Sequence, residues 1–334
     1  MSASTPITGR NGGVSAVPGK LPDAIHVAVG VIRNPRGEIL IAQRLAGTHL
    51  AGLWEFPGGK LEPGETPLSG LIRELQEELG IAVTAAMPLL RIRHDYPERR
   101  VLLDVWEVTA FAGRPEGQQG QPLQWVVAEA LSGIRFPAAN RPIATAARLP
   151  ERYAILEADS PDPGLLLANL RRLTENGIRL IQCRAKALQA QPGFPAFARQ
   201  VVEFCRARGI RVLINAEPAL AHTLGADGVH LTSQRLMKLR ERPGNDAFWV
   251  AASCHDAAEL QHAEGIGVDF AVLGPVAATT THPGMTPLGW GRFAELVDAV
   301  NFPVYALGGL AEVDLASARH SGARGIAAVR AFLE

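Results

Sequence analysis

The sequence has few of the features that mark a secreted, membrane-bound or nucleic-acid-binding protein. Only three cysteines occur among its 334 residues, Cys183, Cys205 and Cys254, and their spacing matches neither a metal site nor a disulfide framework. Reduced, cytoplasmic thiols are therefore expected. No apolar run is long enough to span a bilayer, so no membrane segment is predicted. Basic and acidic residues number 33 each, which leaves no overall field to attract nucleic acid.

Length and composition indicate two globular domains. A chain of 334 residues exceeds a typical single domain, and 47% hydrophobic residues are enough for sizeable cores. Residues 1–23 are rich in Gly, Ser, Thr and Pro and lack the apolar segment of a signal peptide, so a disordered leader is expected there. The pattern of the remaining chain predicts a first domain over residues 24–150 and a second over residues 151–334.

The most informative stretch is residues 58–81, GGKLEPGETPLSGLIRELQEELGI. Thr66 suits the N-cap of a helix, Pro67 suits its first turn, and Gly80 suits the left-handed residue that ends it. Apolar residues at helical spacing predict one stripe facing a core, and they are Leu68, Leu71, Ile72, Leu75 and Leu79. The sequence therefore predicts an amphipathic helix behind a glycine loop.

A second face of this helix is acidic. Glu74, Glu77 and Glu78 are spaced i, i+3 and i+4, so their carboxylates repel each other unless cations lie between them. Mg²⁺ is the expected cation, because it takes hard oxygen ligands and shares its shell with water and phosphates. A solvated acidic face is the alternative for a bare E-x-x-E-E, but the glycine loop, Glu65 and Arg73 also occur here at fixed offsets.

The combined pattern from Gly59 onward, G-x5-E-x7-R-E-U-x-E-E-x-G-U with U a bulky apolar residue, is identified as a Nudix box. The segments WEFPGGK, VAVGVIRNPRGEILIAQR and FPAANRP extend the resemblance over about residues 25–150, to the MutT-type 8-oxo-dGTP diphosphatases. The resemblance implies a Mg²⁺-dependent hydrolase, with Mn²⁺ as the alternative cation. Such an enzyme converts 8-oxo-dGTP and related nucleoside triphosphates to the monophosphate and pyrophosphate, and so cleans the nucleotide pool for DNA replication and repair.

The same resemblance implies roles for individual residues. The implied metal ligands are Glu74, Glu77, Glu78 and the carbonyl of Gly58. Glu74 would also orient or deprotonate the attacking water, and Glu65 would pair with Arg73 to hold the helix against the loop. Where the family often has a further glutamate ligand, this chain has Gln119, and a neutral amide is a poorer metal ligand.

The implied base pocket consists of Arg44, Phe56, Arg99 and Asn140, with Asn140 reading the edge of the oxidised guanine. The residues alone leave other roles open for three of these side chains. Arg44 also fits a solvated strand end, Asn140 a turn before a helix, and Phe56 the packing of a core.

The fold predicted for the first domain is an α+β Nudix fold. Two strands over residues 25–32 and 38–43 are expected to form a hairpin that delivers Arg44 toward the box. Further strands are predicted over residues 89–94, 101–108 and 123–127, and a closing helix within residues 136–149. Strands on both sides of one acidic helix give a layered structure.

The second domain is predicted to be an α/β protein with a (β/α)₈ TIM barrel. Strands are expected over residues 153–157, 180–184, 211–215, 228–231, 249–254, 270–274, 304–307 and 325–329. Helical segments fill most intervals between them, at residues 164–174, 197–208, 257–262, 291–299 and 313–320. The functional end of such a barrel lies at the C-terminal ends of its strands.

Those strand ends carry polar residues and glycines. The candidate ligand site consists of Gln182, Arg184, Lys186, Asn215, Ser253, His255, Thr279, Thr281, Gly308 and Gly309. Alternation in QCRAK is expected to place Gln182, Arg184 and Lys186 on one side. The pair Gly308-Gly309, late in the barrel, suits a phosphate.

Residues of about 152–334 resemble the thiamine phosphate synthase and thiazole tautomerase superfamily. The synthases have an aspartate directly after the asparagine of strand three and another after strand four, where this chain has Ala216 and Arg235. These aspartates help to hold the Mg²⁺-diphosphate, so their loss should impair displacement of diphosphate. His282 likewise replaces a lysine, whereas His255 remains available for proton transfer, as in the tautomerases.

Three functional readings of the whole chain stay open at this point. The first, which the context of Asn140 favours, is a hydrolase of 8-oxo-dGTP fused to a thiamine phosphate synthase-like barrel of undetermined activity. The second is a thiamine-precursor enzyme, a tautomerase or synthase, with an accessory pyrophosphohydrolase. The third is a hydrolase whose non-catalytic barrel binds a thiazole phosphate-like ligand. All three have small-molecule partners, and none requires a membrane or a nucleic acid.

Overall fold

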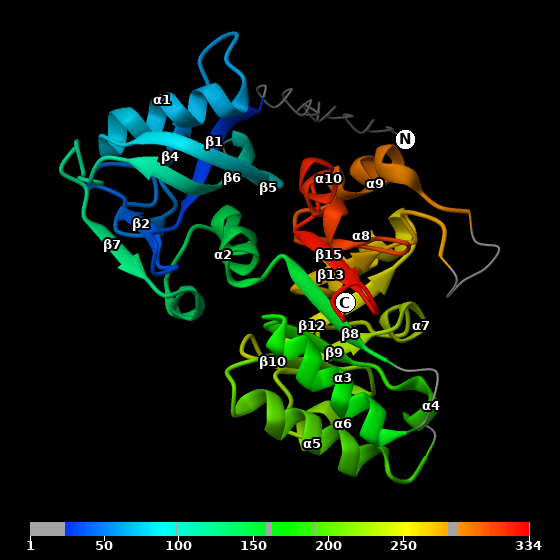
Figure 1. Cartoon of the computed structure of the whole chain (residues 1–334). Helices are drawn as coiled ribbons and strands as arrows, with labels where there is room; N and C mark the ends of the chain where they lie inside the picture. Colours follow the sequence, from blue (N-terminus) through cyan, green and yellow to red (C-terminus); the bar gives the residue numbers. More distant parts are fainter. Residues whose placement is uncertain (1–23, 98, 158–161, 190, 280–285, 334) are drawn as a thin grey trace, which may run out of the picture.

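The chain is known from a computed structural model that describes residues 24–97, 99–157, 162–189, 191–279 and 286–333. The expected leader over residues 1–23, together with Thr281 and His282, lies outside the described residues. The described chain forms two lobes, joined where helix α2 (Arg141–Arg148) leads into strand β8 (Arg152–Leu156) (Figure 1). None of the described helices is both long and apolar enough to cross a membrane.

The N-terminal lobe has the predicted α+β Nudix fold, built on two sheets. The first sheet has the strand order β4-β1-β6-β5, with β1 (Ile25–Ile32) antiparallel to β4 (Gly58–Lys60) and parallel to β6 (Arg99–Ala112). The second sheet has the order β3-β2-β7. The remaining elements of the lobe are β2 (Ile39–Gln43), β3 (Trp54–Glu55), α1 (Pro67–Leu79), β5 (Ala82–Tyr96), β7 (Leu123–Val126), η1 (Ala128–Gly133) and η2 (Ala138–Asn140).

The hairpin expected between the first two strands is wrong. Strands β1 and β2 meet only in a bridge between Arg33 and Ile39, and then belong to different sheets. Both edges of β1 are already occupied, one by β4 and the other by β6, so β2 must pair elsewhere. The side chain of Asn34 fixes the turn between them, because its Oδ1 accepts hydrogen bonds from the backbone N–H of Arg36 and of Glu38, at 2.9 and 3.0 Å.

Helix α1 forms with the caps that its sequence predicts. The Oγ1 of Thr66 accepts a hydrogen bond from the Ser69 backbone N–H at 3.2 Å, and Gly80 adopts φ 68° after the last turn. The predicted apolar stripe is only partly correct, since its N-terminal members Leu68 and Ile72 are exposed. Those two flank the buried arc, whose members are Leu71, Leu75 and Leu79, all packed under the first sheet. The closing helix α2 begins at Arg141, after the short η2 turn, and lies within the predicted residues 136–149.

The C-terminal lobe is a closed barrel of eight parallel strands, as predicted. Its strand order is β10-β11-β12-β13-β14-β15-β8-β9. The strands after β8 are β9 (Leu180–Cys183), β10 (Arg211–Ile214), β11 (Gly228–Leu231), β12 (Trp249–Cys254), β13 (Phe270–Leu273), β14 (Val304–Leu307) and β15 (Gly325–Ala328). The helical segments are α3 (Pro163–Glu175), α4 (Lys186–Gln189), α5 (Phe194–Arg206), α6 (Pro218–Thr223), α7 (Ser233–Leu236), α8 (Ala257–Ile266), α9 (Gly289–Asp298), η3 (Glu312–Asp314) and α10 (Leu315–His320).

Two apolar clusters pack against the barrel strands, one on their outer side and one in the barrel interior. Outside the strands, the helices bury aliphatic side chains together with the three cysteines, all of which are free and buried. Inside, aromatic rings occupy the interior, with Tyr153 5.3 Å from Phe270 and Phe270 5.4 Å from Tyr305 between ring centroids. A barrel packed in this way is a solid core, so ligands must bind at its ends.

The two lobes meet through buried charges. Arg319 is only 2% exposed, and its guanidinium donates to Glu107 at 3.1 Å and to the carbonyl of Pro88 at 3.1 Å. Arg319 also pairs with Glu151, and Arg324 donates to the carbonyl of Ala146 at 3.1 Å. Separating the lobes would leave these buried charges without their partners, which is costly. The contacts therefore hold the two lobes together.

Candidate functional site

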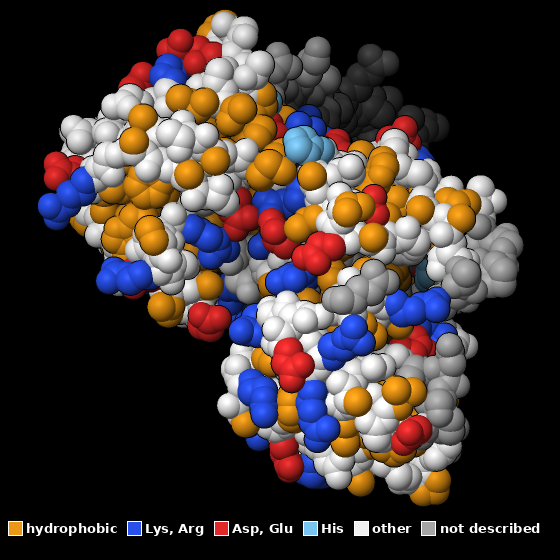
Figure 2. Space-filling view, viewed as in Figure 1, with side chains coloured by type: hydrophobic (Ala, Val, Ile, Leu, Met, Phe, Trp, Pro, Cys, Tyr) orange, Lys and Arg blue, Asp and Glu red, His pale blue; other side chains and the backbone are white. Residues whose placement is uncertain are grey.

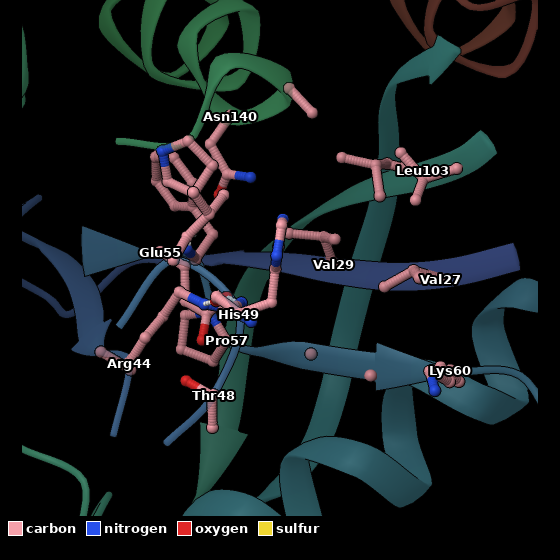
Figure 3. A pocket seen from close by; sticks show the side chains of 18 of the residues that line it. Val27, Val29, Arg44, Thr48, His49, Glu55, Pro57, Lys60, Leu103 and Asn140 are labelled. Atoms are coloured by element: carbon pink, nitrogen blue, oxygen red, sulfur yellow. Dashed lines mark hydrogen bonds and ion pairs between the residues drawn. The ribbon is translucent and has the colours of Figure 1, made fainter. Parts of the chain in front are cut away.

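A cavity of about 340 Å³ opens on the N-terminal lobe beside the glycine loop. It brings together six residues predicted from the sequence, and they are Arg44, Phe56, Gly58, Glu78, Arg99 and Asn140. Gln119, at the place of the missing glutamate, lines the same cavity. Figure 3 shows Arg44, Glu55 and Asn140 reaching it from different segments, with Val29 and Leu103 adding apolar lining. The cavity therefore has a polar end at the loop and an apolar wall on the sheet.

The acidic helix is joined to the glycine loop through Glu78. Its Oε2 accepts a hydrogen bond from the Gly58 backbone N–H at 3.1 Å. Burial, reinforced by the charges of Glu55 and Glu74, raises the pKa of Glu78 to about 7 in spite of that hydrogen bond. Carboxylates crowded in this way favour a bound cation.

Glycine is required at both positions of the loop. Gly58 has φ 148°, and a Cβ there would lie 2.1 Å from the carbonyl oxygen of Ala28. A Cβ on Gly59 would lie 2.1 Å from the carboxyl group of Glu74. Because neither residue has a side chain, the carboxylates of Glu74 and Glu78 lie directly against the loop backbone.

Arg73 organises the carboxylates around it. The expected ion pair with Glu65 is present and bidentate, with distances of 2.8 and 2.9 Å. This contact is the main reason why the pKa of Glu65 is lowered to about 2. Arg73 also donates to Glu74 at 2.9 Å and to Glu77 at 3.3 Å, and to the carbonyl of Lys60 at 2.9 Å. The helix is thereby fastened to the loop.

The donor set fits Mg²⁺ after one side-chain rearrangement. In the described part of the chain, no three His, Cys, Asp or Glu side chains are close enough to hold a metal as they stand. The reason is that Arg73 engages Glu74 and Glu77. The side chain of Glu77 is 58% exposed and free to rotate toward Glu74 and Glu78, which already face the loop. Hard carboxylate oxygens beside a phosphate-sized cavity are the chemistry that Mg²⁺ requires.

Asn140 and Phe56 are linked at the other end of the cavity. The Phe56 backbone N–H donates to the Oδ1 of Asn140 at 3.4 Å, which leaves the amide nitrogen of Asn140 for a ligand. The Phe56 ring is 3% exposed and stacks on Phe136, with the ring centroids 5.2 Å apart. Of the two roles left open for Phe56, the structure shows core packing beneath the cavity.

Two cavity residues were not identified from the sequence. Glu55 forms an ion pair with Arg44, which is therefore not a solvated strand end. Glu55 also adds a negative charge beside Glu78. His49 also lines the cavity, and its carbonyl accepts from the Nε of Arg44 at 2.6 Å. The position of Glu55, three residues before Gly58, was the feature of the sequence that could have identified it.

The barrel has its own cavity, of about 110 Å³, at the C-terminal ends of the strands. Six predicted residues line it, and they are Gln182, Arg184, Ser253, His255, Thr279 and Gly308. The other four are Gly309, Thr281, Lys186 and Asn215. Thr281 is outside the described residues and Gly309 directly follows the lining residue Gly308, so only Lys186 and Asn215 need a physical explanation.

Lys186 fails the prediction because strand β9 ends at Cys183, before the alternation reaches it. Ala185 turns the chain with φ 30°, and Lys186 begins the short helix α4 with its side chain exposed. Asn215 is buried, at 4% exposure, and its Oδ1 accepts from the Nη1 of Arg235 at 3.2 Å. Its side chain therefore contacts a guanidinium and not the cavity.

Arg235 stands where the sequence comparison expects a metal-binding aspartate. Besides Asn215, it pairs with Glu217 at 2.7 Å. With Ala216 beside them, these residues offer a cation and not a carboxylate cluster. The described residues of the barrel hold no group of three metal-ligating side chains. Arg235 and Ala216 therefore do not provide the carboxylates that would hold a Mg²⁺-diphosphate at this place.

A buried hydrogen-bonded chain lies beneath the barrel cavity. The Nδ1 of His230 is 3.0 Å from the hydroxyl of Tyr153, and its Nε2 is 2.9 Å from the Oγ of Ser253. Burial, followed by the charge of Arg184, lowers the pKa of His230 to about 3, so this ring is neutral. His255 is half-exposed at the cavity rim, with its Nδ1 2.9 Å from Glu259.

Comparisons with known proteins separate along the same two lobes. The family model described as NUDIX domain matches residues 28–146, and the one described as thiamine monophosphate synthase matches residues 153–332. The N-terminal part is similar to an 8-oxo-dGTP diphosphatase of Escherichia coli (strain K12), with 42% identity over 119 residues, 36% of this chain and 92% of the relative. The C-terminal part is similar to a thiamine-phosphate synthase of Herpetosiphon aurantiacus, with 36% identity over 185 residues, 54% of this chain and 87% of the relative.

Among solved structures, one from a structure and function analysis of MutT of Aliivibrio salmonicida and Vibrio cholerae is 38% identical. The match covers 38% of this chain and 98% of the chain in that structure, with a TM-score of 0.34. The chain thus belongs to the Nudix family in its N-terminal part and to the thiamine monophosphate synthase family in its C-terminal part.

Proposed function

We propose that residues 24–150 form a Mg²⁺-dependent nucleoside triphosphate pyrophosphohydrolase that acts on 8-oxo-dGTP and so cleans the nucleotide pool. One observation carries the proposal. The glycine loop with Glu78 and the amide of Asn140 line one cavity of about 340 Å³. A triphosphate at one end and a purine at the other would occupy that cavity together. The similarity to 8-oxo-dGTP diphosphatases supports this substrate class.

The chain's own residues divide the chemistry between them. A bound Mg²⁺, held by Glu74, Glu77, Glu78 and the Gly58 carbonyl, supplies charge neutralisation for the triphosphate. Arg73 holds the helix against the loop through Glu65 and the carbonyl of Lys60, which keeps Glu74 beside the loop backbone. Glu74 faces the loop backbone and is positioned to orient or deprotonate the attacking water.

The base end of the cavity selects the substrate. Asn140 presents its amide nitrogen while its oxygen is held by Phe56, which defines one orientation of the amide. Arg44 is held by Glu55 and by the carbonyl of His49, and Arg99 lines the same region. Rate enhancement in such a site comes mainly from positioning and electrostatics, with no covalent intermediate.

The direct test is a hydrolysis assay on the full chain with 8-oxo-dGTP and dGTP, with Mg²⁺, Mn²⁺ or EDTA. The proposal requires metal-dependent release of the nucleoside monophosphate and pyrophosphate, with higher kcat/KM for the oxidised base. Release of inorganic phosphate instead, or equal activity in EDTA, would reject it.

For residues 151–334 we propose a barrel that binds a phosphorylated ligand of the thiazole phosphate type without condensing it with a pyrimidine diphosphate. Arg184 and Gly308 give its cavity anion-binding groups, whereas Arg235 and Ala216 supply no metal carboxylate. A tautomerase-type proton transfer by His255 remains compatible with its place at the rim. Calorimetric titration of the full chain with thiazole phosphate tests the binding.

A further inference from the structure

The cleft between the two lobes, at the N-terminal end of the barrel, contains an excess of basic side chains. It has a volume of about 520 Å³ and is lined by five arginines, namely Arg33, Arg148, Arg179, Arg211 and Arg324. Figure 2 shows Lys and Arg side chains gathered with Asp and Glu along the junction between the lobes. This cleft is separate from both cavities described above, with which it shares no lining residue.

Three glutamates also line the cleft, but two of them are already engaged. Glu107 pairs with Arg33 at 2.7 Å and with Arg319 at 3.1 Å, and Glu151 pairs with Arg319. Glu129 is the third, and its charge acts on Arg148 and Arg211 only at longer range. The lining of the cleft therefore has more arginines than glutamates, although Asp227 acts on Arg211 and Asp269 acts on Arg148 and Arg211 from outside it.

Arg148, Arg179 and Arg211 are the lining arginines that have no carboxylate of a described residue in direct contact. None of the three forms an ion pair with a carboxylate in the parts of the chain that the structure describes. Their guanidinium groups donate to neutral carbonyl groups, from Arg211 to Arg148 at 3.4 Å and from Arg179 to Ile178 at 3.0 Å. The buried Nε of Arg148 has no hydrogen-bond partner among the described residues. A buried donor without a partner costs free energy, so the Arg148 side chain is not satisfied by the protein alone.

Two of these cations are held against one aromatic ring. The guanidinium carbons of Arg148 and Arg211 lie 4.5 and 4.3 Å from the ring centroid of Trp249. Burial and then the charge of Arg211 lower the pKa of Arg148, and burial lowers the pKa of Arg211. The indole ring offsets part of the repulsion and holds the two groups in place. Two fixed guanidinium groups so arranged form a preorganised receptor for an anion.

We propose that this cleft binds a multiply charged phosphate anion through Arg148, Arg179 and Arg211. Guanidinium groups match phosphate oxygens in pairs of hydrogen bonds, and three of them require more than one negative charge. Phosphate, pyrophosphate and the phosphate group of an ester share this chemistry. Arg148 comes from the N-terminal lobe, whereas Arg179 and Arg211 come from the barrel. The bound anion therefore bridges the lobes and stabilises their junction.

The test uses the full chain in EDTA at constant ionic strength, titrated with phosphate, pyrophosphate or dGMP. Thermal unfolding and calorimetry are the readouts, and EDTA removes metal-supported binding at the Nudix box. The expected result is a saturable rise in Tm for at least one anion. Arg179→Gln and Arg211→Gln should each weaken binding about tenfold or more, as expected for loss of one charge-assisted contact. Arg179 is exposed, so that variant should fold even if Arg211→Gln does not.

Two controls localise the effect. Arg199→Gln removes the same charge from an exposed position on α5 and should leave binding unchanged. Arg184→Gln alters the barrel cavity, so any anion binding that this variant loses belongs to that cavity and not to the cleft. Stronger binding of pyrophosphate than of dGMP identifies the free anion as the ligand, and the reverse order identifies an ester. Non-saturable shifts, equal binding by Arg179→Gln and wild type, or loss only in Arg184→Gln would each overturn the proposal.

Discussion

Glu78 on helix α1 accepts a hydrogen bond from the Gly58 backbone N–H at 3.1 Å, and this contact couples the acidic helix to the glycine loop. The loop approaches closely because Gly58 and Gly59 have no side chains. On the other side of the helix, Arg73 binds Glu65 in a bidentate pair. The helix is thus fixed against the loop from both sides, and only the exposed side chain of Glu77 must rearrange for the carboxylates to meet at one cation.

We predict that Glu77→Gln and Glu78→Gln each lower kcat about 10²-fold or more, roughly 3 kcal/mol in the barrier. Both changes remove a metal-binding charge and keep the side-chain shape. Folding should be retained, because the apolar arc of Leu71, Leu75 and Leu79 is untouched. Steady-state assays and thermal unfolding measure the two effects. Glu62→Gln, on the exposed loop before α1, is the matched control. Near-normal rates in both variants would remove this helix from the catalytic site.

Mg²⁺ binding should strengthen as the pH rises through about 7, the pKa of Glu78 in the metal-free protein. The metal requires the carboxylate, so at lower pH it must displace a proton. The stability of the metal-free fold changes in the opposite direction. Because the pKa of Glu78 is higher in the folded than in the unfolded protein, Glu78 stabilises the metal-free fold at a pH below the unfolded-state pKa. This stabilisation is lost as the pH rises through the folded-state pKa of about 7. The rise in Tm on adding Mg²⁺ should therefore be larger at about pH 8 than at about pH 6. A pH-independent shift in wild type, or one equal to that of Glu78→Gln, would contradict this.

Asn140→Ala should lower kcat/KM for 8-oxo-dGTP more than for dGTP. The expected difference is about 1–3 kcal/mol, the cost of losing one buried hydrogen-bond partner. Asn140→Asp separates two explanations, because it keeps the oxygen that Phe56 contacts and removes the amide donor. Selectivity should fall in both variants. Equal losses on the two nucleotides would mean that Asn140 only shapes the loop.

Local patterns in the sequence predicted the elements that local physics determines. The helix over the Nudix box and the eight barrel strands follow from spacing and caps within a few residues. The strand pairing of β1 could not be predicted in this way. Its neighbours come from residues 58–60 and 99–112, and they leave no edge of β1 for β2. Lys186 was misplaced because alternation was extended past the end of a four-residue strand.

Contacts between distant residues could not be read from the sequence. Arg319 and Glu107 are separated by 212 positions, yet both are nearly inaccessible at the junction. In isolation each is an ordinary charged residue that should be exposed. The hydrogen bond from Arg235 to Asn215 is similar, since the sequence showed only that an expected carboxylate was missing. Glu55 was overlooked because its neighbour Glu78 is brought to it only by the fold.

Glu107→Gln should destabilise the protein by about 3–5 kcal/mol, since it leaves buried arginines without their counter-charge. Burial alone would raise the pKa of Glu107, but Arg324, Arg33 and Arg319 outweigh it and lower the pKa to about 2. A depressed pKa contributes stability that is present above the unfolded value of 4.5 and is lost as the pH falls toward 2. Denaturant unfolding should show the wild-type advantage shrinking over that window. Glu116→Gln is an exposed control, and an advantage that does not change with pH would contradict the assignment.

The barrel should not form thiamine phosphate at a sustained rate, even with Mg²⁺ present. Expelling diphosphate requires its charge to be neutralised as the bond breaks, and Ala216 and Arg235 provide no carboxylates to hold a metal there. Arg235 is itself a cation, but Glu217 and Asn215 already hold its guanidinium. The assay uses the full chain with Glu77→Gln, so that the Nudix site does not consume the diphosphate substrate. The paired change Ala216→Asp with Arg235→Asp should increase Mg²⁺ binding at the barrel, and any synthase activity gained must depend on that metal. Sustained product from the chain without those two changes would show that Arg235 replaces the metal, and would refute the prediction.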